Sequence, residues 1–121
     1  LFHCGDEPLT TPLTVAFAAA AVPEATIILG HMGAYLHTDE AIEVAERHDN
    51  IILETSGMPY PHKIAEAVRR IGAERVMFAS DGPGCSPKID LEKIRVAGLS
   101  PADEALVMGL NAKKLIDGVV A

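Results

Sequence analysis

Cysteine is scarce in this sequence. Only two occur among 121 residues, which is too few for the disulfide framework that stabilises small secreted domains. Cys4 and Cys85 also lie too far apart for a C-x-x-C metal site. We therefore expect both to be free thiols.

Long apolar runs and clusters of positive charge are missing as well. The longest apolar stretch, Val15 to Val22, is too short to span a bilayer, and no positively charged signal segment precedes it. The formal net charge is -7, and no basic cluster exceeds the pairs Arg69-Arg70 and Lys113-Lys114. Nucleic acid and anionic membranes are therefore not expected as partners, and the expected location is the cytoplasm.

The composition that remains is typical of a globular protein. Hydrophobic residues make up 49% of the chain and charged residues 22%, and a chain of this length can bury a core if its topology closes. We predict a single domain over residues 1–121. The chain begins at Leu1 with no room for a full strand before His3, so we expect it to be cut from a longer one.

Short apolar runs alternate with helical patterns along the chain. The runs are continuous, which is typical of parallel strands covered on both faces, and parallel strands require connections of the helical kind seen between them. The predicted strands are Leu1–Cys4, Thr26–Leu29, Asn50–Thr55 and Arg75–Ala79.

Capping residues and prolines mark the predicted helices. Thr11 and Pro12 begin the first, which Pro23 ends; Thr38 caps the second; Pro61 and Gly72 bound the third. A fourth runs from about Lys88 to Ala97, and a capping box at Ser100–Asp103 begins the last. The buried faces are expected to hold Ala41, Ile42 and Ala45 in the second helix, and Ile64, Ala65, Val68 and Ile71 in the third.

Polar residues follow the four predicted strands at equivalent places. His3, His31, Ser56 and Asp81 are separated by 28, 25 and 25 residues, close to the period of one strand and one helix in a (β/α)8 barrel, about 30 residues. Four such units make half of a barrel, and barrel active sites lie where the carboxyl ends of the strands converge. We therefore predict an α/β half barrel with one site at these ends.

Two imidazoles and a carboxylate are ligands that a catalytic zinc ion prefers. If the strands curve about one axis, His3, His31 and Asp81 converge on a common point, where Gly30 and Gly33 leave space for an ion, a water or a substrate. A divalent metal there, with Zn²⁺ preferred, would activate a water. Asp81 would ligate the metal or accept a proton from the water, and His31 would act as a general acid or base.

Structural interpretations compete with this one. A histidine at a strand end is often only hydrogen-bonded, and the segment around Asp81 is also an ordinary turn sequence. The shared position of the three residues in the repeat favours function. Ser56 has no base beside it and is predicted to line the pocket, whereas Glu54, on the same side of the strand, is predicted to be a buried polar partner.

The remaining histidines lie beside or within helix ends. His37, His48 and His62 are expected to be solvated or to interact with helix dipoles, although His37 and His62 could reach the rim. No glycine-rich segment has the spacing of a phosphate-binding loop, which disfavours the alternative of an open flavodoxin-like sheet.

Several motifs together resemble one family: FHCG at 2–5, IILGHMG at 27–33, NIILETSG at 50–57, RVMFASDGP at 75–83, and LSPADEA with NAKKL near the end. In this order they resemble the C-terminal half, about strands five to eight, of the amidohydrolase-2 family. These are TIM-barrel metal-dependent hydrolases and non-oxidative decarboxylases, including the aminocarboxymuconate-semialdehyde decarboxylase group. The resemblance implies that His3 and Asp81 bind the metal and that His31 is a ligand or the acid or base beside the metal-bound water.

The family's H-x-H pair, on the first strand of its barrel, has no counterpart in this sequence. The implied activity is hydrolysis or decarboxylation of a small organic acid, lactone or amide through a metal-activated water. We expect that activity of a longer parent enzyme, and we expect this chain alone to be inactive. Its partner would be the missing N-terminal half or a second copy. The alternative is a non-catalytic half-barrel module for binding or assembly, in which the histidines are structural.

Overall fold

The computed structural model describes residues 1–120 and has an α/β fold. The strands are β1 (Phe2–His3), β2 (Ile27–Gly30), β3 (Ile51–Glu54) and β4 (Val76–Met77). The α-helices are α1 (Pro12–Ala21), α2 (Thr38–Arg47), α3 (Pro61–Ile71), α4 (Pro87–Val96), α5 (Pro101–Ala105) and α6 (Asn111–Val120). Short turns of other helix types are η1 (His31–Gly33), η2 (Ala73–Arg75) and η3 (Leu106–Leu110). Within this part of the chain no helix is long and apolar enough to cross a membrane.

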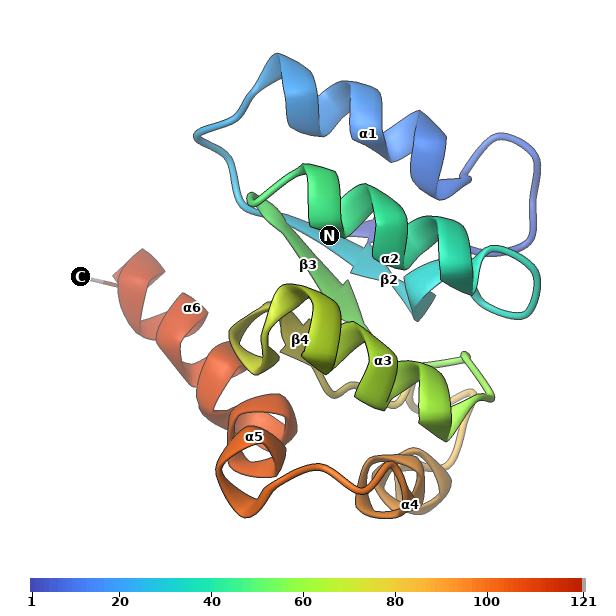
Figure 1. The fold of residues 1–121 in the computed structure, drawn as a ribbon, viewed down its shortest axis with the longest axis vertical. Coiled ribbons are helices and arrows are strands. Elements are labelled where there is room, and N and C mark those ends of the chain that lie inside the picture. Colours follow the sequence, from blue (N-terminus) through green and yellow to red (C-terminus); the bar gives the residue numbers. More distant parts are fainter. Residues whose placement is uncertain (121) are drawn as a thin grey trace.

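The four strands form one parallel sheet in the order β1-β2-β3-β4. Helices α1, α2 and α3 connect consecutive strands and lie side by side on one face of the sheet (Figure 1). The predicted parallel sheet with helical crossovers is therefore confirmed. A flavodoxin-like sheet reverses its strand order at a switch point, and no reversal occurs among β1 to β4, so that alternative is wrong.

The main hydrophobic core lies between the sheet and these helices. Leu29, Leu53 and Val76 are fully buried on the strands, and they belong to one cluster with Ile42 of α2 and Ile64 of α3. Side chains alternate between the faces of a strand. The intervening positions, which include Glu54 of β3, therefore lie on the opposite face of the sheet.

Most predicted helix ends are confirmed. The Thr11 hydroxyl accepts a hydrogen bond from the Thr14 N–H at the start of α1, and Gly72 follows α3 with φ 86°. Thr38 is an exception, because it is the first residue of α2 and not its cap. Its hydroxyl donates to the Ala34 carbonyl at 2.7 Å, since a threonine side chain can bond back to a carbonyl four residues earlier.

The buried faces of the second and third helices were predicted with different success. Ala41, Ile42 and Ala45 are buried in α2 as expected. In α3, Ile64 and Ile71 are buried, but Ala67 takes the central position and Ala65 and Val68 are only half-buried. The predicted α3 stripe was therefore partly wrong, because the buried positions are Ile64, Ala67 and Ile71, three and four residues apart.

The last predicted strand is shorter than expected. Residues 73–75 form η2, and the Phe78 N–H donates to the Val107 carbonyl of η3 at 2.8 Å instead of extending the sheet. The predicted final helix is interrupted as well. The Ser100 hydroxyl caps α5 as predicted by accepting from the Asp103 N–H, but η3 then separates α5 from α6.

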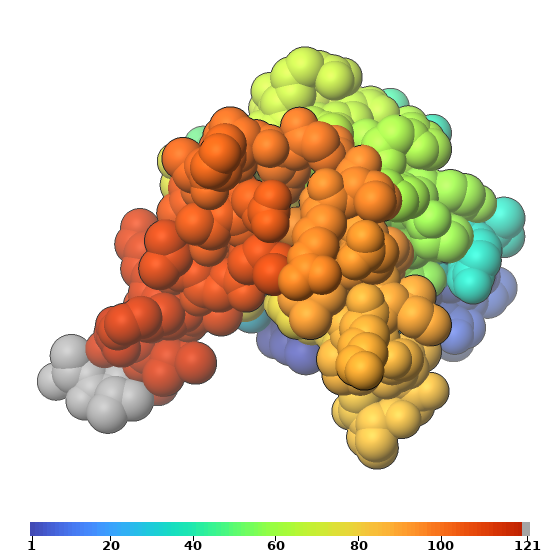
Figure 2. All heavy atoms as spheres, turned by 90° about the horizontal axis from the view of Figure 1, so that it is seen from below, coloured from blue at the N-terminus to red at the C-terminus, as the bar shows by residue number. Residues whose placement is uncertain are grey.

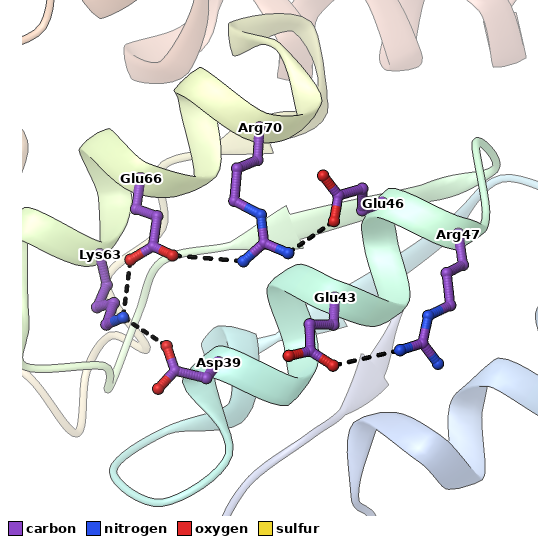
Figure 3. Close-up of polar contacts among 7 residues, drawn as sticks. All are labelled: Asp39, Glu43, Glu46, Arg47, Lys63, Glu66 and Arg70. Carbon is purple, nitrogen blue, oxygen red and sulfur yellow. Dashed lines mark hydrogen bonds and ion pairs between the residues drawn. The ribbon is translucent and has the colours of Figure 1, made fainter.

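Helices α2 and α3 are joined at their surface by an ion-pair network (Figure 3). We call Asp39, Glu46, Lys63, Glu66 and Arg70 the α2–α3 network. The Lys63 amine contacts Asp39 and lies 2.7 Å from a Glu66 oxygen, while the Arg70 guanidinium contacts Glu66 at 3.3 Å and Glu46 at 2.6 Å. Hydrogen bonding to Lys63 lowers the pKa of Glu66, and hydrogen bonding to Arg70 lowers the pKa of Glu46.

Candidate active site

The polar residues that follow the strands surround one cavity of about 390 Å³. Its lining contains all three predicted metal ligands; the full set is Leu1, His3, Gly30, His31, Glu54, Ser56, Ala79 and Asp81. Figure 2 shows the segment after β4 (amber) and α6 (red) projecting from the body on the side away from α3, with a hollow between them. The cavity itself lies at the carboxyl ends of the strands.

His31 follows β2 in a left-handed backbone conformation, with φ 65°. Its N–H donates to a Glu54 carboxylate oxygen at 3.1 Å. Its ring Nδ1 lies 3.1 Å from the Ser56 carbonyl oxygen and 2.9 Å from the Ser56 hydroxyl. The imidazole is thereby attached to the neighbouring strand at both its backbone and its ring.

Glu54 and Ser56 form a tight local arrangement at the end of β3. Glu54 is buried, with 7% of the residue exposed, and its carboxylate accepts from both the Ser56 N–H at 2.5 Å and the Ser56 hydroxyl at 2.8 Å. Glu54 is thus the buried polar partner that was predicted, and Ser56 lines the pocket as predicted. Their contact with His31 was not predicted, because it depends on the pairing of β2 with β3.

His3 lies against His31. The two rings are edge to face, with centroids 4.8 Å apart and an interplanar angle of 72°. The exposed His3 ring also places Nε2 3.0 Å from a Glu7 carboxylate oxygen, and this hydrogen bond lowers the pKa of Glu7. A Cβ on Gly5 would lie 2.5 Å from that Glu7 oxygen, so a larger residue there would displace the Glu7 side chain. Glu7 was missed in the sequence, where only its spacing of four residues from His3 pointed to it.

Asp81 lies in the loop after β4 and also has a left-handed backbone, with φ 51°. It is exposed and shares the cavity with the two histidines. Among residues 1–120, however, no three His, Cys, Asp or Glu side chains are grouped closely enough to hold a metal ion. The structure brings His3 and His31 into contact and places Asp81 on the same cavity, and coordination of one ion by all three stays a prediction.

The two glycines predicted to leave space for a ligand differ. Gly30 lines the cavity. Gly33 is not part of this lining; a Cβ there would lie 2.7 Å from the Thr38 backbone nitrogen, and its φ is 87°. The role predicted for Gly33 was therefore wrong: it serves the tight turn into α2, where only a residue without a side chain fits.

The cysteines and the other histidines lie outside this cavity. Both thiols are free, as predicted. Desolvation by burial raises the pKa of the Cys4 thiol to about 12, so the thiol is protonated at neutral pH. Cys85 is exposed beside a separate cavity of about 370 Å³. Neither His37 nor His62 is part of the His31 cavity lining.

Comparison with known proteins identifies the family. The sequence profile of the amidohydrolase-2 family, described as Amidohydrolase, matches residues 2–117. The chain belongs to this family. The resemblance noted in the sequence motifs is therefore confirmed. Comparison with curated protein sequences found no match.

Solved structures of three decarboxylases are similar to this amidohydrolase-2 chain. The 2,6-dihydroxybenzoate decarboxylase from Rhizobium is 20% identical with a TM-score of 0.66, over 92% of this chain and 43% of that one. A dihydroxybenzoic acid decarboxylase from Polaromonas sp. JS666, with bound manganese and the inhibitor 2-nitroresorcinol, is 21% identical with a TM-score of 0.64, over 92% and 42%. The 5-carboxyvanillate decarboxylase LigW from Sphingomonas paucimobilis is 23% identical with a TM-score of 0.68, over 88% and 39%.

These similarities show the fold. The chain spans less than half the length of each of these enzymes. Its parallel strands and helical connections are those of part of an amidohydrolase-2 structure, whereas its assignment to the C-terminal half of a (β/α)8 barrel stays a prediction.

Proposed function

We propose that this chain supplies one side of the active site of a metal-dependent decarboxylase or hydrolase acting on a small organic acid. The observation that carries the proposal is the shared cavity of His3, His31 and Asp81 at the carboxyl ends of β1, β2 and β4. Two imidazoles and a carboxylate fit a divalent metal ion in donor type. Zn²⁺ is one candidate because histidine and carboxylate donors are its usual ligands. Mn²⁺ is another, because the Polaromonas enzyme has bound manganese.

The proposed chemistry divides between metal and protein. A divalent ion held by His3, His31 and Asp81 would lower the pKa of a bound water and polarise a substrate oxygen. His31 is held in place by β3 and serves either as a metal ligand or as the group that exchanges a proton with the substrate. The exposed Asp81 carboxylate has the same two alternatives: it ligates the ion or accepts a proton from the water.

Aromatic carboxylates are the first substrates to test. All three similar enzymes are named for the decarboxylation of a benzoic acid derivative. A lactone or amide would instead indicate hydrolysis at the same site. We further propose that the chain corresponds to strands five to eight of a barrel, that the remaining ligands come from a longer polypeptide or a second copy, and that the protein acts in the cytoplasm.

Metal binding tests the proposal directly. We expect Mn²⁺ or Zn²⁺ to bind when titrated into the chain in a calorimeter. His31→Ala or Asp81→Ala should each weaken this binding by more than roughly 10–100-fold, which is the loss typical when a residue that only hydrogen-bonds to a metal ligand is changed. His48→Ala is the matched control, since His48 follows α2 at the opposite end of the sheet. Equal binding by all four proteins would contradict the proposal.

A non-catalytic assembly module is the second candidate. It is favoured by exposed apolar side chains on the edge strand β1 and on α1, the helix that follows it: Phe2 is 48% exposed and Phe17 is 80% exposed. An unpaired strand edge beside such a surface favours association. A metal-free dimer in sedimentation velocity, unchanged by His31→Ala and Asp81→Ala, would support this candidate over the first.

A further inference from the structure

We infer that Ser56 and Glu54 are positioning residues that hold His31 in one tautomer, with the proton on Nδ1 and the lone pair on Nε2. The tautomer follows from hydrogen-bond geometry alone. Its use in binding a metal ion or exchanging a proton rests on the proposed function.

The first argument comes from the Ser56 carbonyl. A carbonyl oxygen only accepts hydrogen bonds, and this one lies 3.1 Å from His31 Nδ1. The contact is a hydrogen bond only if Nδ1 carries the proton. A neutral imidazole has one protonated and one unprotonated nitrogen, so Nε2 is left with the lone pair.

The second argument comes from the Ser56 hydroxyl. It has a single proton, which it donates to the Glu54 carboxylate at 2.8 Å because a carboxylate only accepts. The same hydroxyl oxygen lies 2.9 Å from His31 Nδ1. With its proton already committed to Glu54, the hydroxyl must accept from Nδ1, which selects the same tautomer as the carbonyl does.

The backbone geometry fixes the ring in this position. One oxygen of Glu54 accepts from the His31 N–H at 3.1 Å, and the other accepts from the Ser56 N–H at 2.5 Å. Gly57 lets the ring approach, because a Cβ at that position would lie 3.0 Å from Nδ1 and its φ is 67°. The carboxylate therefore orients the backbone of His31 directly and its ring through Ser56.

The consequence concerns the other ring nitrogen. None of the hydrogen bonds within residues 1–120 involves Nε2 of His31, and His31 lines the cavity. Groups that accept a hydrogen bond from one nitrogen of a histidine ligand fix its tautomer and also orient the other nitrogen toward the metal. Nε2 is thus the nitrogen presented for a metal ion or for a substrate proton.

Nitrogen NMR of the ¹⁵N-histidine-labelled chain tests the inference. At a pH above the ordinary histidine range, we expect the two His31 nitrogen shifts to be widely separated, with the protonated-type signal at Nδ1. Ser56→Ala and Glu54→Gln should each shift part of the population toward the Nε2-protonated form, because the Ser56 carbonyl still accepts from Nδ1 but the hydroxyl contact is lost or weakened. Ser56→Thr, which keeps the hydroxyl, should restore the original pattern. The signals of His48 serve as a control in every spectrum.

The outcomes separate this inference from the proposed function. A wild-type His31 protonated on Nε2, or folded Ser56→Ala and Glu54→Gln proteins with unchanged His31 shifts, would overturn the inference. A fixed Nδ1-protonated form in a chain that binds no metal would uphold it while contradicting the proposed function. If metal does bind, we expect Ser56→Ala to weaken it roughly 10–100-fold and Ser56→Thr to restore it.

Discussion

The two faces of the sheet differ in what their side chains contact. On the face covered by α1, α2 and α3, strand residues such as Leu29 and Leu53 are fully buried among aliphatic side chains. On the other face the strand ends carry a buried carboxylate, two touching imidazoles and a cavity. The comparison shows that the packing which stabilises the sheet and the groups capable of chemistry are kept on opposite faces.

Left-handed backbone occurs both at the cavity and in the buried turn before α2, where Met32 and Ala34 have φ values of 34° and 48°. His31 and Asp81, at the ends of β2 and β4, have positive φ values of 65° and 51°. Such conformations are unfavourable for residues with a side chain and are concentrated at functional sites. Of the two, His31 is held by Glu54.

The largest expected difference between the two faces is in the reactivity of the two thiols. Cys4 belongs to the helix-side core and Cys85 to the exposed loop after β4. With a pKa of about 12, roughly one Cys4 side chain in 10⁴ is a thiolate at pH 8, and thiolate is the reactive form. Ellman's reagent should therefore detect one thiol in the folded chain and two in urea. If both thiols react at one rate in the folded chain, or if a rapidly reacting thiol remains in Cys85→Ser, the predicted difference between Cys4 and Cys85 is wrong.

Adjacent residues of β2 test the difference in packing. Leu29 is fully buried on the helix side, whereas Ile28 is only half-buried on the other face. We expect Leu29→Ala to lower the free energy of unfolding by ~2–5 kcal/mol, and Ile28→Ala by ~1 kcal/mol, both measured by urea denaturation. Equal losses would show that the two faces are packed alike.

Asp81→Gly is expected to act in the opposite direction. Glycine relieves a left-handed strain of ~1–3 kcal/mol but loses ~0.5–1 kcal/mol in chain entropy, so the free energy of unfolding should rise by up to ~2.5 kcal/mol. Metal binding should be lost at the same time. Asp81→Asn is the control, because asparagine tolerates this backbone but lacks the charge: it should lose metal without the gain in stability. A less stable Asp81→Gly protein would argue that no strain resides there.

The α2–α3 network should give the smallest effect, with a defined pH dependence. Folding lowers the pKa of Glu66 below its ordinary value of 4.5, chiefly through Lys63, so its stabilisation is present above that value and is lost as pH falls through the folded pKa. Glu66→Gln should cost ~0.5 kcal/mol at neutral pH and nothing in acid.

The contribution of Lys63 to stability depends on pH in the opposite direction. Folding raises its pKa, chiefly through Asp39, so its stabilisation is complete below the ordinary value of 10.5 and is lost as pH rises through the folded pKa. Thermal unfolding at several pH values and salt concentrations measures both effects. Glu43→Gln, which removes only a pair with Arg47 within α2, is the control. A pH-independent loss in Glu66→Gln would contradict the electrostatic origin.

Much of the fold was predictable because its signals are local. The Thr11 cap, the Gly72 terminator and the apolar runs of β2 and β3 each depend on a few neighbouring residues, and all appear where expected. The errors lie where distant contacts intervene. Phe78 leaves the sheet because it bonds to Val107, and Thr38 turns back to Ala34 instead of capping α2.

The amino-acid sequence by itself determined that parallel strands alternate with helices and that His3, His31 and Asp81 follow those strands at one phase of the repeat, because periodicity and spacing are properties of the chain. Only the tertiary structure decided that Glu54 and Ser56 hold His31 and that Glu7 and His31 contact His3. The first arrangement joins residues more than 20 positions apart, so it exists only once β2 and β3 have paired in register.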